Sequence, residues 1–175
     1  MKLSLVAGLL GLCGLASVAQ AHVTLETTQA AAGSYYKAVL RVGHGCDGAD
    51  TTRVRVRIPD GVLSVKPQPK AGWTLDLTQG RYDQPQTVHG APVESGVREI
   101  SWTGVLPEAY YDEFVFRAYL SEGIQPGQTV YFPVVQECGE AVSRWIDTSG
   151  APDAAEPAPG VKITAPAHGG HGHSH

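Results

Sequence analysis

The sequence lacks any clustered charge. It contains 13 Lys and Arg against 17 Asp and Glu, which gives a formal net charge of −4 at pH 7, and no basic stripe stands out. Nucleic-acid binding needs cations that neutralise phosphates, so the composition argues against that class of partner. The chain also lacks a G-x-S-x-G, an H-E-x-x-H and a P-loop motif, and no carboxylates pair at helical spacing. We therefore expect a protein that is not an enzyme.

Helical periodicity is also missing. Between residues 22 and 150, no window of ten or more residues repeats its apolar positions with a period of 3.6. Residues 52–59 (TRVRVRIP) instead alternate strictly between apolar and polar side chains, which is typical of a strand with one face in a core and one in water. The same reasoning predicts strands at 35–42, 97–102, 113–120, 129–135 and 143–148, with shorter ones at HVTLE, LSVKP and WTLDL.

Turn signals fall between these strands. They include Pro59-Asp60-Gly61, Gly72, Gly80, Gly90, Ser95-Gly96, Pro107 and Pro126-Gly127. Many short strands without helices predict an all-β fold, an antiparallel β-sandwich of immunoglobulin-like type.

The N-terminus has the pattern of a secretory signal peptide. Lys2 precedes an apolar run over residues 3–18, and Ala19-Gln20-Ala21 has the A-x-A ending of a cleavage site. The run is too short for a stable membrane span. A lipoprotein signal ending at Cys13 is the rival, but Leu12 fits it poorly. We expect residues 1–21 to be cleaved, which exports the protein to the periplasm with His22 as its first residue and leaves no stable membrane anchor.

Cysteine is scarce. Cys13 lies in the leader, so the exported chain keeps Cys46 and Cys138, without C-x-x-C spacing. In an oxidising compartment such a pair predicts a disulfide, worth roughly 4 kcal/mol by the chain-entropy estimate. Two thiolate metal ligands are the alternative.

After Gly150 the composition changes. The stretch APDAAEPAPG reads as a Pro/Ala linker that does not pack into a core, and we therefore predict a domain over residues 22–150 and a linker with a tail over 151–175. The tail ends in HGGHGHSH, where His168, His171, His173 and His175 predict loose binding of divalent metal ions. A solvated tail without a role is the alternative.

A chain that begins with histidine has an unusual metal-binding option. The α-amine and Nδ1 of His22 can close a six-membered chelate ring on one ion, and an amine with a reference pKa of about 7.7–8.0 gives up its proton readily to a metal. Two such nitrogens suit Cu(II), which also binds most tightly among the divalent first-row ions. An internal histidine has no free amine, so this hypothesis depends on cleavage after Ala21.

Five ordered segments, AHVTLE, GSYYKAVLRVGHGCDG, TTRVRVRIPDGVLSVKPQPKAGWTL, YYDEFVFRAYL and YFPVVQEC…RWID, together resemble the YcnI-like family of exported domains, which are often encoded near copper-handling proteins. The resemblance covers about residues 21–148. It implies a β-sandwich that holds Cu(II) through the amine and imidazole of its first residue, with a carboxylate and a nearby tryptophan. By position these are His22 and, in SRWID, Trp145; Trp73 and Trp102 are expected in the core.

The carboxylate is where this sequence departs from the family. One branch has a Trp-Glu pair in the second strand, at about the place of Tyr36-Lys37 here. His44, on a glycine-flanked turn beside Cys46, is the first candidate for the third ligand. Glu26 points to the face of His22 but about 13 Å along the strand. Asp112 and Glu113 are further candidates, and His89 is expected to be simply exposed.

The sequence thus predicts a periplasmic copper-binding protein that delivers, buffers or sequesters Cu(II), as a metallochaperone in copper homeostasis with other copper-trafficking proteins as partners. Two alternatives remain. A copper-dependent oxidative enzyme of the polysaccharide monooxygenase type also begins with histidine and would use His44 as its second histidine. An adhesion or scaffold sandwich would bind no metal in its folded domain.

Overall fold

The computed structural model describes residues 22–166, and within that range the chain forms strands and connecting turns but no helix. No helix among these residues is long and apolar enough to cross a membrane. The predicted leader and the four tail histidines lie outside the described residues.

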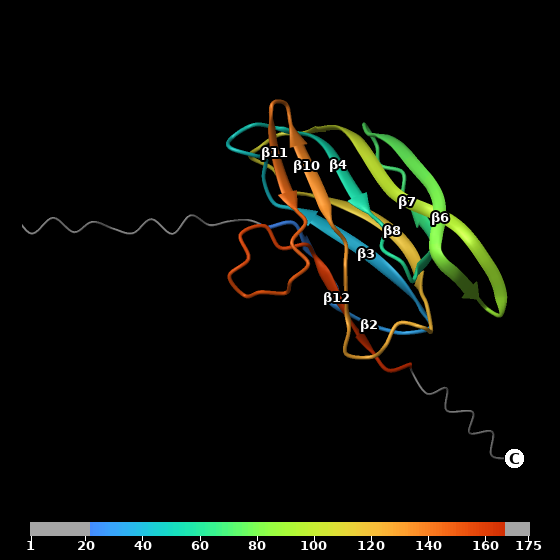
Figure 1. The fold of residues 1–175 in the computed structure, drawn as a ribbon. Coiled ribbons are helices and arrows are strands. Elements are labelled where there is room, and N and C mark those ends of the chain that lie inside the picture. The colour runs from blue at the N-terminus through green and yellow to red at the C-terminus, as the bar shows by residue number, and fades with distance from the viewer. Residues whose placement is uncertain (1–21, 167–175) are drawn as a thin grey trace, which may run out of the picture.

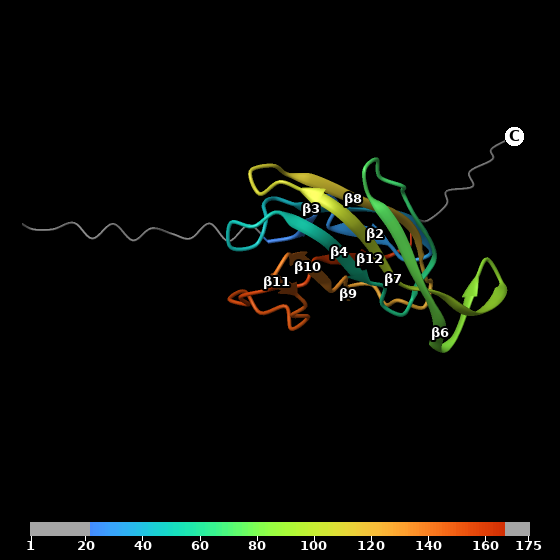
Figure 2. The ribbon, with the colours of Figure 1, turned by 90° about the horizontal axis from the view of Figure 1, so that it is seen from above.

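Two antiparallel sheets face each other as a sandwich, which confirms the predicted fold class (Figure 1). One sheet has the order β1-β3-β8-β5, and its strands are Thr24–Leu25, Ser34–Val42, Asp112–Leu120 and Val62–Pro67. The other has the order β11-β10-β4-β7-β6, with strands Ala141–Trp145, Val134–Cys138, Thr51–Arg57, Ala91–Leu106 and Thr74–Val88. The β6–β7 hairpin extends beyond the rest of its sheet (Figure 2).

The core lies between these sheets, where the alternating strands meet. Val54 and Val56 point inward from β4, and Phe114 and Phe116 face them from β8, all with no exposed surface. Trp102 is completely buried in the same cluster, and Trp73 packs against it while partly buried. The period of two that predicted these strands therefore also identified their buried faces.

A third, smaller sheet closes one side of the sandwich. Its order is β2-β12-β9, with strands Gln29–Ala31, Gly160–Thr164 and Thr129–Tyr131. Strand β12 runs parallel to β2 and buries Val161 and Ile163 in the core. The domain boundary predicted at Gly150 is therefore wrong, because the Pro/Ala stretch is followed by a strand that completes the fold.

Two further predictions differ from the structure. The strand expected at 129–135 is two strands, β9 and β10, because the chain changes sheets around Pro133, which has no N–H to offer a ladder. Gly80 and Gly96 are not turns but partners within the β6–β7 ladder. A Cβ on Gly96 would lie 1.9 Å from the hydroxyl of Tyr82, so glycine there permits a close approach rather than a turn.

The predicted disulfide is present. Cys46, in the turn after β3, bonds to Cys138 at the end of β10, with the two Cα atoms 5.7 Å apart. The bond joins a turn that follows one sheet to a strand of the other. Thiolate ligation by the two cysteines is thereby excluded in the oxidised protein.

Candidate functional site

His22 is the first described residue and lies two residues before the start of β1. Strand β1 is held by its pairing with β3, where Thr24 stands opposite Arg41. The His22 side chain is half-buried, and its Nε2 atom is fully buried without a hydrogen-bond partner, the one such side-chain atom within the described range. Buried polar atoms in folded proteins are almost always paired, so an unpartnered imidazole nitrogen calls for an explanation.

Trp145 is the aromatic neighbour of His22. It is the last residue of β11 and only 4% of its surface is exposed. Its ring meets the His22 ring edge-on, with the ring centroids 5.4 Å apart and an angle of 63° between the ring planes. The placement of Trp145 beside His22 agrees with the position that the family resemblance implied.

Gln136 lies behind Trp145. Its Oε1 accepts a hydrogen bond from Trp145 Nε1 at 3.2 Å, and its Nε2 donates to the His44 carbonyl and to Thr51 Oγ1, both at 2.7 Å. The Thr51 hydroxyl lies 3.8 Å from the sulfur of Cys138. A hydrogen-bonded chain therefore connects the wall of the His22 site to the disulfide. The sequence analysis missed Gln136, although a polar residue between the inward-facing Val134 and Cys138 was a usable signal.

His44 takes part through its backbone rather than its ring. Its carbonyl accepts from Gln136, and its Nδ1 lies 2.5 Å from the carbonyl oxygen of Gly45. The turn that carries His44 is thus fixed next to the disulfide, as expected, but its imidazole interacts locally.

Glu26 and Glu113 are occupied by Arg41. The Arg41 guanidinium lies 2.7 Å from Glu26 Oε1 and 3.4 Å from Glu113 Oε1, and the Tyr111 hydroxyl donates to Glu113 at 2.8 Å. Asp112 pairs with Lys70 at 2.6 Å. Glu26 and Glu113 therefore belong to ion pairs on the outer face of the β1-β3-β8 sheet, and Asp112 belongs to an ion pair at the start of β8.

No three side chains of His, Cys, Asp and Glu within residues 22–166 form a group that could hold a metal ion. The structure therefore does not assemble His22 with His44, Glu26 or Glu113 into one ligand set. The donors that remain at this place belong to His22 itself: its Nδ1 and, once the chain is cleaved after Ala21, its amine. That pair fits a two-nitrogen chelate without requiring a third side chain. The buried Nε2 lies on the far side of the ring and cannot bind the same ion as that amine.

His89 lies elsewhere, at the tip of the β6–β7 hairpin. It is exposed, as expected, with Nε2 3.3 Å from the Tyr35 hydroxyl and its ring 5.0 Å from that of Tyr119. It contributes nothing to the His22 site.

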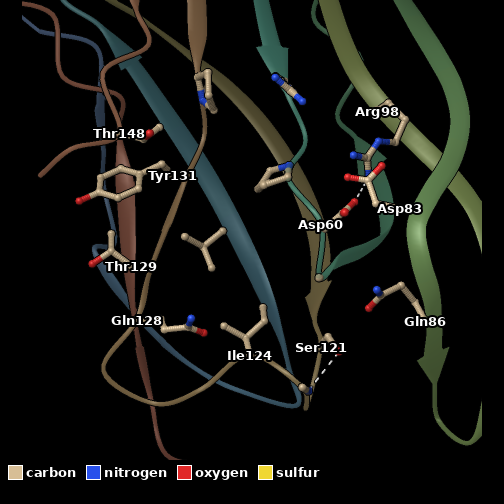
Figure 3. A pocket seen from close by; sticks show the side chains of 16 residues that line it. Asp60, Asp83, Gln86, Arg98, Ser121, Ile124, Gln128, Thr129, Tyr131 and Thr148 are labelled. Carbon is tan, nitrogen blue, oxygen red and sulfur yellow. Dashed lines mark hydrogen bonds and ion pairs between the residues drawn. The ribbon is translucent and has the colours of Figure 1, made fainter.

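A hollow in the described fold also lies away from His22. It encloses about 630 Å³ between the β6–β7 hairpin and the segment that leads into β9. Figure 3 shows the ion pair of Arg98 and Asp60 on one wall and Tyr131 and Thr148 on the other. None of the residues that build the His22 site lines this hollow.

Comparison with known proteins agrees with the fold. A family model described as "Domain of unknown function (DUF1775)" matches residues 22–163. A solved structure of an uncharacterized protein from Nocardia farcinica, described as having an immunoglobulin-like fold, is 27% identical, with a TM-score of 0.61. The match covers 82% of this chain and 99% of that one. No curated protein matches the chain.

Proposed function

This chain belongs to the DUF1775 family, which characterises the YcnI-like proteins, and on that premise we propose that its immunoglobulin-like sandwich is an exported carrier of one Cu(II) ion bound at His22. The observation that supports the proposal most is the packing of the half-buried His22 ring edge-on against Trp145, which holds the imidazole at the point where cleavage would free the amine. A residue without a role at the chain start would be expected to leave its imidazole in water.

The chemistry rests on one residue. Cleavage after Ala21 frees the amine of His22, and this amine together with the imidazole chelates Cu(II) as a pair of neutral nitrogen donors. Water would supply the remaining ligands, because Glu26 and Glu113 are paired with Arg41 and Asp112 is paired with Lys70. The buried Trp145, whose ring packs against the imidazole of His22, would lie beside an ion held there.

A carrier role follows from an incomplete ligand set. Because His22 provides both protein donors, a partner that offers more ligands can take the ion without unfolding the sandwich. We therefore propose delivery or buffering of copper in the periplasm, with copper-trafficking proteins as partners and no enzymatic step. The histidines of residues 168–175 provide a second, looser store.

The test uses the mature chain, residues 22–175, with the four tail histidines replaced by alanine so that only the folded domain is measured. Its N-terminus is verified by mass spectrometry, and Cu(II) titration is followed by electron paramagnetic resonance. The matched control carries an acetyl group on the His22 amine, which removes that donor but leaves the imidazole.

We expect one tightly bound ion with nitrogen hyperfine structure in the mature chain, and a loss of about 100-fold or more in affinity in the acetylated chain, since one of two chelating donors is removed. Equal binding by both chains would show that the amine is not a ligand. If neither chain binds Cu(II), the proposed function is wrong and the alternative of an adhesion or scaffold sandwich that binds no metal is favoured.

A further inference from the structure

The strongest unexplained feature of the site is a buried glutamine. Gln136 is 2% exposed and lies in β10, where the neighbouring inward positions carry apolar or disulfide-bonded residues. Burying an amide costs free energy unless its donors and its acceptor are all paired. Here they are: the amide oxygen accepts one hydrogen bond and the amide nitrogen donates two.

The partners of Gln136 allow a single orientation of its amide. The Trp145 indole offers only a donor, and the His44 carbonyl only an acceptor. Turning the amide over would place N–H against N–H at Trp145 and oxygen against oxygen at His44. The Thr51 hydroxyl accepts from the same nitrogen and can donate its own proton toward Cys138. Each hydrogen bond in this series therefore fixes the orientation of the next group.

We propose that Gln136 is a positioning residue of the His22 site, holding the indole of Trp145 against the imidazole and joining it to the turn of His44. The effect on copper binding rests on the proposed function, but the hydrogen bond from Trp145 to Gln136 is present without metal. The hydrogen bonds of the Gln136 amide go to Trp145, His44 and Thr51 and not to His22, so its loss should change the surroundings of the ion rather than the number of ions bound.

The packing around the network supports this role. Trp145 is the aromatic neighbour of the His22 ring, and its indole N–H hydrogen-bonds to Gln136. Without that bond the indole loses the polar contact that fixes its rotation. Gln136 is itself held by hydrogen bonds to Thr51 on β4 and to the His44 carbonyl in the turn before β4. The geometry of the site is thus set by the five-stranded sheet and the disulfide turn together.

The experiment labels tryptophan with 5-fluorotryptophan and records 19F spectra of the mature chain with and without Cu(II). Trp145→Phe assigns the Trp145 signal among the three tryptophans. Gln136→Met removes all three hydrogen bonds at similar volume. Thr51→Val removes one partner of the amide, and Thr51→Ser retains it as the conservative rescue. Gln128→Met, at a glutamine in the hollow away from His22, is the matched control.

We expect Gln136→Met to shift and broaden the metal-free Trp145 signal, to keep one copper ion per chain, and to weaken copper affinity about tenfold with altered hyperfine splitting. Thr51→Val should show part of this effect, and Thr51→Ser and Gln128→Met none. If Gln136→Met does not fold, the Thr51 pair decides the question by the same signal.

An unchanged Trp145 signal in Gln136→Met, or in Thr51→Val where the first variant does not fold, would overturn the inference even if copper binds normally. Failure of the unaltered mature chain to bind copper would instead overturn the proposed function. In that case the metal-free spectra would still decide whether Gln136 positions Trp145.

Discussion

At the scale of single residues, Tyr36 shows how burial sets the pH range in which this protein is stable. Its side chain is 4% exposed, and its hydroxyl donates to the Thr27 carbonyl. Burial, with a smaller contribution from the charge of Glu26, raises the pKa of Tyr36 from 10.0 to about 12. The folded protein therefore keeps this proton over a range in which the unfolded chain releases it.

The direction of the pH effect follows from linkage. A pKa that is higher in the folded state adds stability that is complete below pH 10 and is lost as the pH rises toward about 12. We predict that the free energy of unfolding falls less steeply between pH 10 and 12 in Tyr36→Phe than in the unaltered chain. Urea unfolding at several pH values measures both slopes, with pH 8 as the internal reference. Parallel slopes would contradict the prediction.

Sequence reasoning reached part of the site at this scale. His22 and Trp145 were predicted because a leader, a chain start and a family pattern point to them directly. The proposed carboxylate ligands were wrong because Arg41 pairs with both Glu26 and Glu113, and the pairing of β3 with β8 that brings Glu113 there joins segments distant in sequence. Gln136 was missed because nothing local shows which donor meets its amide.

At the scale of elements, β12 is where sequence reasoning failed. The segment is only five residues long and follows a Pro/Ala stretch, so its composition suggested a linker. Its stability comes from pairing with β2 and β9 and from burying Val161 and Ile163, which no local pattern reveals. Strands β3, β4 and β8 were predicted because their alternation continues over seven to nine residues, whereas β6 and β7 were predicted only in part because Gly80 and Gly96 suggested turns.

Ile163 provides the test at this scale. We predict that Ile163→Ala lowers the free energy of unfolding by about 2–5 kcal/mol, because a completely buried side chain leaves a cavity between the sheets. The adjacent, exposed Lys162→Ala is the control and should change it by less than about 0.5 kcal/mol. Chemical denaturation of the two variants measures the difference. Equal stability would mean that β12 does not contribute to the core.

At the scale of the whole molecule, the disulfide limits the unfolded chain. Cys46 and Cys138 are 92 residues apart, so their bond restricts much of the unfolded ensemble. The chain-entropy estimate for such a loop is about 4–5 kcal/mol. We predict that the double variant Cys46→Ala/Cys138→Ala melts roughly 10–20 °C below the unaltered protein. Calorimetry measures the shift, with the reduced, unaltered protein as a second reference. A shift of under about 3 °C would contradict the prediction.

The parallel pairing of β12 with β2 also determines when the fold can be completed. Residues 29–31 lie near the start of the sandwich, yet their partners are residues 162–164, at its far end. A chain that emerges from a ribosome or a translocation pore N-terminus first must therefore wait with an open edge beside β2 until nearly all of it has emerged. The last strand to appear closes the side of the sandwich on which one of the first strands lies, so a chain cut short before residue 160 leaves that side unsealed.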